Sequence, residues 1–248
     1  MREVVENLRR HSVDLKKRFE YDFSFNEKIF DAEEILKFEN AKDIYHKNII
    51  LKEVLEAKYR VVRNQSELDF WVINKWGGIN SFKDTERNKQ KIISFKDEIS
   101  HKRSMLVSSF DTISSLSKIA SFMYPEDFVI YDARVIFSLN WLIYSVNVSS
   151  KPKKYFPIPN GRNSKLSQYD MKTIINIGHN VQNKNDESKL YFSKKDAYFS
   201  YCKFIKENVE EIMGIGAKPY ELEMLLFVIA DVEIFKEISK LSFNLTKK

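Results

Sequence analysis

The stretch ISSLSKIASFMYPEDFVIYDARV, residues 113–135, decides which fold the sequence predicts. Its first half has apolar residues at helical spacing around Lys118, and Pro125 ends that run because proline cannot continue a helix. Asp132 stands directly before the apolar run ARVIFSLNWLIY, a position where aspartate is a favoured N-cap. The stretch therefore predicts two helices joined by a turn, with a lysine on the first helix and an aspartate at the start of the second.

The rest of the chain favours helices as well. Only 6 Gly and 5 Pro interrupt 248 residues, too few for the frequent turns of an all-β domain, and 43% hydrophobic residues can form a substantial core. Apolar residues at helical spacing predict helices within residues 31–38, 41–62, 90–99, 194–209 and 220–240. We expect an all-α protein with a long loop at residues 148–170 and an exposed connection at residues 179–189.

The segment ELDFWVINKWGG, residues 67–78, is rich in aromatic residues and ends in a glycine pair. Glycine tolerates the left-handed conformation at the C-terminus of a helix, so the pair predicts the end of a helix. Aromatic side chains at this density usually belong to a core, and this is one interpretation of Trp71 and Trp76.

The charge and cysteine content limit the partners and the compartment. The 41 Lys and Arg exceed 35 acidic residues, which gives a formal charge of +6 and a pI near 9.1 and suits either nucleic acid or a solvated lysine-rich surface. The single cysteine, Cys202, excludes an intramolecular disulfide and a multi-cysteine metal site. The N-terminus lacks the apolar core of a signal peptide, and no apolar run is long enough for a membrane span. We expect a soluble cytoplasmic protein.

Several classes of enzyme have no motif in this sequence. The four histidines are scattered without metal-ligand spacing, so we expect no metal. The sequence also lacks a P-loop, a dinucleotide-binding fingerprint and a GxSxG motif. Hydrolases of the GxSxG type, NTPases and nicotinamide enzymes are therefore not indicated.

The segment SKIASFMYPEDFVIYDARV, residues 117–135, resembles the catalytic region of the helix-hairpin-helix DNA glycosylases, most closely that of the oxidised-guanine group. These enzymes carry a lysine near the start of the helix that follows their hairpin and an aspartate at the N-terminus of a later helix. Lys118 and Asp132 stand in that order, 14 residues apart, about one helical turn closer than the family pattern. The residues from Ser114 to Ser117 occupy the place where the family hairpin has glycines.

The resemblance implies a shortened, divergent glycosylase-like domain over residues 1–248, either undivided or formed by two helical subdomains around a cleft. It implies excision of an altered base from duplex DNA after base flipping, by a monomer without a cofactor, in genome repair or in defence against modified phage DNA. Asp132 would stabilise the oxocarbenium character of the sugar. Lys118 would attack the sugar and form a Schiff base, which adds strand-cleaving lyase activity.

The same reading assigns contacts with DNA and with the flipped base. Aromatic residues for stacking the base are Trp71, Trp76 and Tyr131. The residues expected to contact DNA are Ser114, Ser117, Lys151, Lys153, Lys154, Arg162 and Asn163.

Other interpretations of these residues stay open. Asp132 is also explained as a plain helix cap, and Lys118 as a surface lysine. A second stretch, IMGIGAKPYELEMLLFVIAD, has the family's G-x-G-x-K spacing in Gly214, Gly216 and Lys218, and Asp231 follows 13 residues later. Only 17 residues remain after Asp231 to complete a core, which favours Asp132.

Two functions from other classes remain as alternatives to the enzyme. One is a catalytically silent, helical nucleic-acid-binding module. The other is a helical interaction protein without a role on DNA, for which we expect negligible and salt-insensitive DNA affinity.

Overall fold

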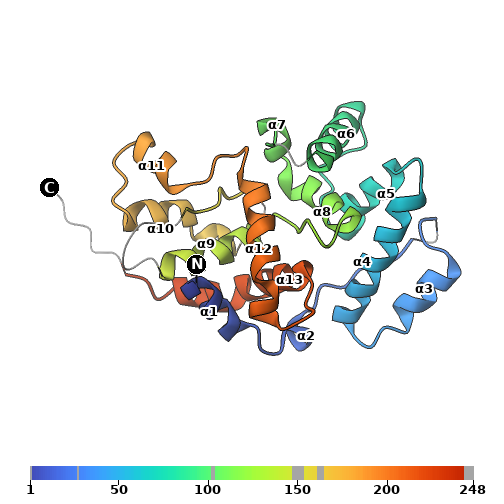
Figure 1. Ribbon diagram of the computed structural model, residues 1–248, viewed down its shortest axis with the longest axis horizontal. Helices are drawn as coiled ribbons and strands as arrows, with labels where there is room; N and C mark the ends of the chain where they lie inside the picture. Colours follow the sequence, from blue (N-terminus) through green and yellow to red (C-terminus); the bar gives the residue numbers. More distant parts are fainter. Residues whose placement is uncertain (1, 27, 102–103, 147–153, 161–164, 243–248) are drawn as a thin grey trace.

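The computed structural model describes residues 2–26, 28–101, 104–146, 154–160 and 165–242, and all regular elements within these ranges are helices (Figure 1). In the same ranges, extended backbone segments pair at one isolated parallel bridge, between Tyr155 and Tyr191. The predicted all-α class is confirmed.

The elements are all helical and follow one another along the chain. They are α1 Arg2–His11, α2 Leu15–Arg18, α3 Ala32–Glu39, α4 Ile44–Val61, α5 Ser66–Phe70, η1 Trp71–Trp76, α6 Glu86–Ser100, α7 Val107–Phe110, α8 Ile113–Met123, α9 Ala133–Ser145, η2 Leu166–Gln168, α10 Met171–Gly178, α11 Lys184–Leu190, α12 Ala197–Met213, α13 Pro219–Ile229, η3 Ala230–Ile234 and α14 Phe235–Ile238.

The helices pack in two groups. Helix α4 packs against α3 and α8, and α8 also contacts η1, α6 and α7; we call the elements α3–α8 the α4 group. Helix α13 packs against α9 and α12, and α1 packs on α9 and α12; we call α1 and α9–α14 the α9 group. In Figure 1 the α4 group lies on the right, α12 and α13 in the middle, and α9–α11 on the left. The segment at residues 124–132 leads from one group to the other.

Local sequence signals explain where the helices begin. The backbone amides of the first helical turn have no acceptor within the helix. Polar side chains at the N-caps accept a hydrogen bond from one of these amides. This holds for α3, α4, α6, α9, α10 and α11, whose caps are Asp31, Asp43, Thr85, Asp132, Asp170 and Asn183. The predicted cap at Asp132 is confirmed.

The two elements η1 and η3 are wider than α-helices. In η1 the amide of Gly77 donates to the carbonyl of Val72 at 2.9 Å, five residues back, which is the π-type pattern. The predicted helix end at the glycine pair is confirmed, because Gly77 is the C-cap and Gly78 has a φ of +66°. Short π-helical turns occur frequently at functional sites.

One sequence prediction about the fold was wrong. Residues 179–189 were expected to form an exposed connection, yet residues 184–190 form α11. Asn183 caps this helix with its side chain, which accepts from the amides of Asn185 and Asp186. Among the residues of α11, Leu190 is buried, so the helix has almost no apolar stripe from which its sequence could predict a helix. Its cap therefore contributes much of its stability.

Within the described ranges, no helix combines the length and the apolar character that crossing a bilayer requires.

Candidate active site

A cavity of about 220 Å³ lies between the two helix groups. Its aromatic walls come from the segment before α3, from η1 and from α13, and its charged groups come from α4, α8, α13 and the start of α9. The residues that line it are Phe19, Tyr21, Lys52, Trp76, Gly77, Lys118, Ile130, Asp132, Arg134, Glu223, Met224 and Phe227. Four charged side chains other than the arginine thus meet in one small apolar space, an arrangement that is typical of functional sites.

A larger open groove of about 830 Å³ adjoins this cavity. It extends past the residues after η1 and past the N-terminal turn of α8, and the polar side chains of Asn80, Asn88 and Lys91 contribute to its lining. The groove and the cavity share Gly77, Lys118, Asp132 and Arg134. Lys118 and Asp132 therefore lie at the junction between the open groove and the cavity.

Lys118 is buried on α8, with 6% of its surface exposed. Its Nζ donates to the carbonyl of Ser114 at 3.0 Å. Burial lowers the pKa of Lys118 from its ordinary value of 10.5, and the negative charges of Asp132 and Glu223 oppose that shift. Because a buried amine loses its proton more readily, the environment favours a nucleophilic lysine.

Gly77 provides the space that the Lys118 side chain occupies. A Cβ at Gly77 would stand 2.6 Å from Cδ and 2.7 Å from Cε of Lys118, and 2.7 Å from the carbonyl oxygen of Ile73. The backbone of Gly77 has φ −80°, which any residue adopts, so the requirement for glycine at this place is steric.

We expect Gly77→Ala to lower the free energy of unfolding by about 1–3 kcal/mol, because the added methyl group overpacks the site. Urea-induced unfolding measures this loss. In a Lys118→Ala background the contacts with Cδ and Cε are gone, so the loss should shrink by about 1 kcal/mol. An equal loss in both backgrounds would mean that Gly77 does not make room for Lys118.

Asp132 combines a structural and a chemical position. Its Oδ1 accepts from the amide of Val135 at 3.0 Å and caps α9. The residue also lines both the cavity and the groove, so one carboxylate serves the helix and faces the cavity. The chain before it is held in place because the amide of Tyr131 donates to Oγ of Ser117 at 3.0 Å.

Lys52 and Glu223 are two further charged residues of the cavity, and sequence reasoning missed both. They are 2% and 5% exposed. Burial lowers the pKa of Lys52 to about 8, although Glu223 acts in the opposite direction. Burial raises the pKa of Glu223 to about 7, against the effect of Lys52. The available signal was a charged residue on the apolar face of its helix, three residues before Leu55 in α4 and three residues before Leu226 in α13.

The Glu223 carboxyl should make stability depend on pH. Its ordinary pKa of 4.5 rises to about 7 in the folded state, so the folded state binds more protons between these values and loses stability as the pH rises. Glu223→Gln removes this titration. Between pH 4.5 and 7.5 we expect the variant to gain about 2–3 kcal/mol relative to the wild type in urea unfolding. Glu53→Gln, at an exposed position of α4, should show no such gain. A pH-independent difference between Glu223→Gln and wild type would contradict the burial of a titrating carboxyl here.

Arg134 is the third charged residue that sequence reasoning missed. Its guanidinium forms an ion pair with Asp231 at 3.0 Å and lies 4.6 Å from the ring centre of Phe227. Asp231 belongs to η3, so the second π-helical turn holds a residue that lines the cavity.

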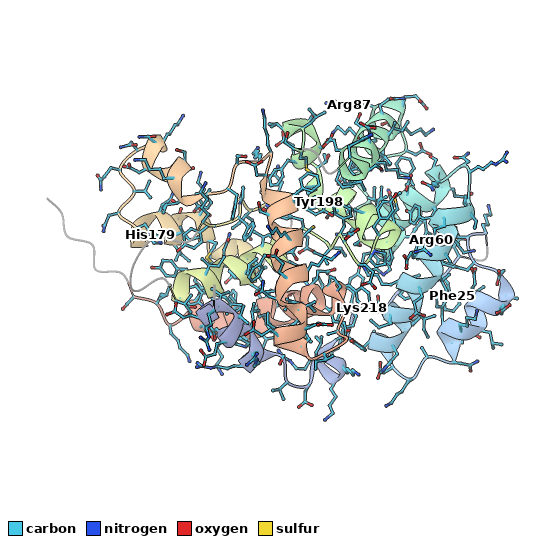
Figure 2. The ribbon with its side chains drawn as sticks, viewed as in Figure 1. Phe25, Arg60, Arg87, His179, Tyr198 and Lys218 are labelled. Carbon is cyan, nitrogen blue, oxygen red and sulfur yellow. The ribbon has the colours of Figure 1, made fainter. Side chains whose placement is uncertain are left out.

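The rival pair from the G-x-G-x-K stretch does not meet. Lys218 lies at the beginning of α13, labelled in Figure 2, and pairs with Glu126 at 2.8 Å. Asp231 follows the C-terminal end of the same 11-residue helix, which is about 16 Å long. Gly214 and Gly216 have φ values of 110° and 83° and form the turn between α12 and α13. This geometry favours Lys118 and Asp132 over Lys218 and Asp231 as the candidate pair.

The aromatic residues assigned to a base pocket take different places. Trp76 lines the cavity and packs edge-on against Phe122. Trp71 packs against Phe30 at a ring distance of 5.0 Å and lies in the core. Tyr131 is fully buried, and its hydroxyl donates to the carbonyl of Pro157 at 2.7 Å. Tyr21 and Phe227 line the cavity, although the sequence did not single them out.

The residues assigned to DNA contacts also differ in position. Ser114 lines the groove, whereas Ser117 is fully buried and its hydroxyl accepts from Tyr131. Lys154 is exposed and lies 5.8 Å from the ring centre of Phe192. The remaining predicted contacts lie outside the described residues; they are Lys151, Lys153, Arg162 and Asn163.

Comparisons of the chain with protein-family models, with curated proteins and with solved structures found no match. In the ranges that the structure describes, no group of three His, Cys, Asp or Glu side chains is placed to hold a metal ion. The geometry of the cavity therefore carries the functional argument.

Proposed function

We propose that this protein is a DNA glycosylase of the helix-hairpin-helix type, which flips an altered base out of a duplex and cleaves its N-glycosidic bond. One observation carries the proposal: Lys118 and Asp132 converge at the junction of the cavity and the groove. The two residue types are those that the chemistry requires, and the segment that holds them resembles the catalytic region of these enzymes.

The volumes of the cavity and of the groove support a different role for each. Pockets for drug-sized ligands measure about 300–1,000 Å³, so a cavity of about 220 Å³ suits something smaller, such as a single heterocycle. Aromatic side chains at its wall provide stacking for a planar base. The open groove, at about 830 Å³, has room for the strand from which the base is taken. The sugar of the flipped nucleotide then lies at the junction.

Asp132 is the residue to which we assign the main catalytic effect. When the bond between C1′ and the base breaks, its electron pair leaves with the base and positive charge develops on the sugar. A carboxylate fixed beside the sugar stabilises that charge without reorganising during the reaction. Water adds to C1′ and loses a proton, the base takes up a proton, and an abasic site remains.

Lys118 gives the enzyme a second route. Its nitrogen attacks C1′ in place of water, loses a proton as the bond forms, and yields a Schiff base when the sugar ring opens. That intermediate leads to cleavage of the strand. The burial that lowers the pKa of Lys118 supports this assignment.

The proposal is tested by incubating the protein with duplex oligonucleotides that each carry one altered base, and by assaying for abasic sites. Product on at least one duplex is the expected result. If no duplex yields product while binding to DNA is strong and falls steeply with salt, the protein is a non-catalytic nucleic-acid-binding module. Negligible DNA affinity together with no product would remove DNA from its function.

A further inference from the structure

The inner part of the cavity contains two charged groups that the proposed chemistry does not use. Lys52 and Glu223 line the cavity but are not among the residues of the groove, whereas Lys118 and Asp132 belong to both. A base that enters from the junction therefore reaches Lys52 and Glu223 beyond the catalytic pair.

Lys52 has a donor to spare. An ammonium group has three N–H donors, and the structure gives its Nζ hydrogen bonds to the carbonyl of Ser121 at 3.3 Å and to Oγ of Ser121 at 3.1 Å. The same Nζ lies 4.3 Å from the ring centre of Phe122, which holds the charge over an aromatic face.

Glu223 has acceptors to spare. Its Oε2 accepts from the amide of Ile130 at 3.4 Å, a long hydrogen bond, and this is the hydrogen bond that the described part of the chain gives to the carboxylate. A carboxylate accepts about four hydrogen bonds in total. The buried carboxyl at 5% exposure thus faces the cavity with most of its capacity unused.

Lys52 and Glu223 interact electrostatically, but neither fills the hydrogen-bonding capacity of the other. Each shifts the pKa of the other, yet among the described residues Lys52 bonds to Ser121 and Glu223 to the amide of Ile130, with no ion pair between Lys52 and Glu223. Buried charges are costly unless they are paired or hydrogen-bonded. A ligand that offers an acceptor to Lys52 and a donor to Glu223 would satisfy both at once.

We propose that Lys52 and Glu223 are the specificity-determining pair of this cavity, and that together they select a base with a lactam edge, a ring N–H beside a carbonyl. Lys52 donates to the carbonyl and Glu223 accepts from the N–H. The inference rests on the proposed function for the kind of ligand. Uracil and hypoxanthine have this edge, whereas cytosine and adenine present an amino group beside a ring acceptor. Guanine and thymine share the lactam edge, so the pair defines the class of base and not the alteration.

The pattern should exclude the wrong class strongly. Adenine would place a donor against the Lys52 ammonium and leave the Glu223 carboxylate opposite an acceptor. A site built from buried polar groups discriminates well, because a mismatched ligand leaves these groups unpaired. We expect hypoxanthine to bind at least about tenfold more tightly than adenine, and uracil more tightly than cytosine by a similar factor.

The experiment measures binding of the four free bases to the full-length protein by isothermal titration calorimetry at pH 7.5, between the pKa of Glu223, about 7, and the pKa of Lys52, about 8, so that both side chains are mainly charged. Lys52→Met and Glu223→Leu each remove one partner and put an apolar side chain of similar size into a buried place. Because each leaves the other charge buried, circular dichroism and thermal unfolding first establish that the variants are folded, and the double variant Lys52→Met/Glu223→Leu, which removes both charges, is measured beside them. In both variants the hypoxanthine-to-adenine ratio should fall close to one. Lys75→Met and Glu53→Gln, at exposed positions beside Trp76 and Lys52, should keep the wild-type ratio.

Three results would overturn the inference: equal binding of hypoxanthine and adenine to the wild type, a ratio that survives in both variants, or no binding of any of the four bases. Since free-base binding needs no catalysis, the outcome is separate from that of the glycosylase assay. A selective cavity without base release would leave the lactam inference standing and remove the proposed enzyme. Base release with an unselective cavity would do the reverse.

Discussion

Asp132→Asn should lower the rate of base release by about 100- to 1,000-fold, the usual effect of removing one electrostatic contact with the transition state. Asparagine keeps the shape of the side chain but not its negative charge, so it cannot stabilise a cationic sugar in the same way. The fold should persist, because asparagine caps helices as well as aspartate does and can still accept from the amide of Val135. The measurement is single-turnover release of base from the duplex on which the wild type is most active.

A matched control separates the cap from the chemistry. Asp170 caps α10 in the same way as Asp132 caps α9, by accepting from a first-turn amide, and it does not line the cavity. Asp170→Asn should therefore retain wild-type release. If both substitutions reduce release equally, or if neither does, Asp132 acts only as a helix cap.

Lys118→Met should abolish the covalent complex that borohydride traps between an active glycosylase and its substrate. Loss of an enzyme nucleophile costs up to about a millionfold in rate, so trapping should fall below detection. Methionine fills much of the same volume beside Gly77 and removes a buried charge, so the variant should remain folded.

The second buried lysine of the cavity makes this test sharper. Lys52 also has a lowered pKa, so it is the other candidate for the trapped nitrogen. We expect Lys52→Met to remain trappable at saturating substrate. Trapping that survives in Lys118→Met and disappears in Lys52→Met would transfer the nucleophile to Lys52. Failure to trap the wild type on a substrate that it processes would leave base removal by water.

The local features of the fold could be predicted from the sequence because they depend on neighbours in the chain. Asp132 before an apolar run and the glycine pair after Trp76 act within one helical turn, and both mark element boundaries in the structure. Helix α11 could not be found by apolar periodicity, since a polar sequence capped by Asn183 forms it. A search for caps alone would have found it.

The candidate site likewise has one part that the sequence could predict and one part that it could not. Lys118 and Asp132 are 14 residues apart and lie in one supersecondary unit, so a family resemblance could bring them together. Lys52 and Glu223 are 171 residues apart, and only the packing of α4 and α13 around the cavity makes them neighbours. Trp71 and Trp76 look equivalent in the sequence. In the structure Trp76 lines the cavity, whereas Trp71 packs against Phe30 in the core, and this difference depends on contacts with distant segments of the chain.

The most direct test of the central claim is mass-spectrometric detection of free base released from the oligonucleotide panel by the wild type, Asp132→Asn and Asp170→Asn in parallel. We predict that the wild type and Asp170→Asn release the same base from the same duplex, and that Asp132→Asn releases at least about 100-fold less. Equal release by all three proteins, or release by none of them on any duplex, would contradict the assignment of this cavity as a glycosylase active site.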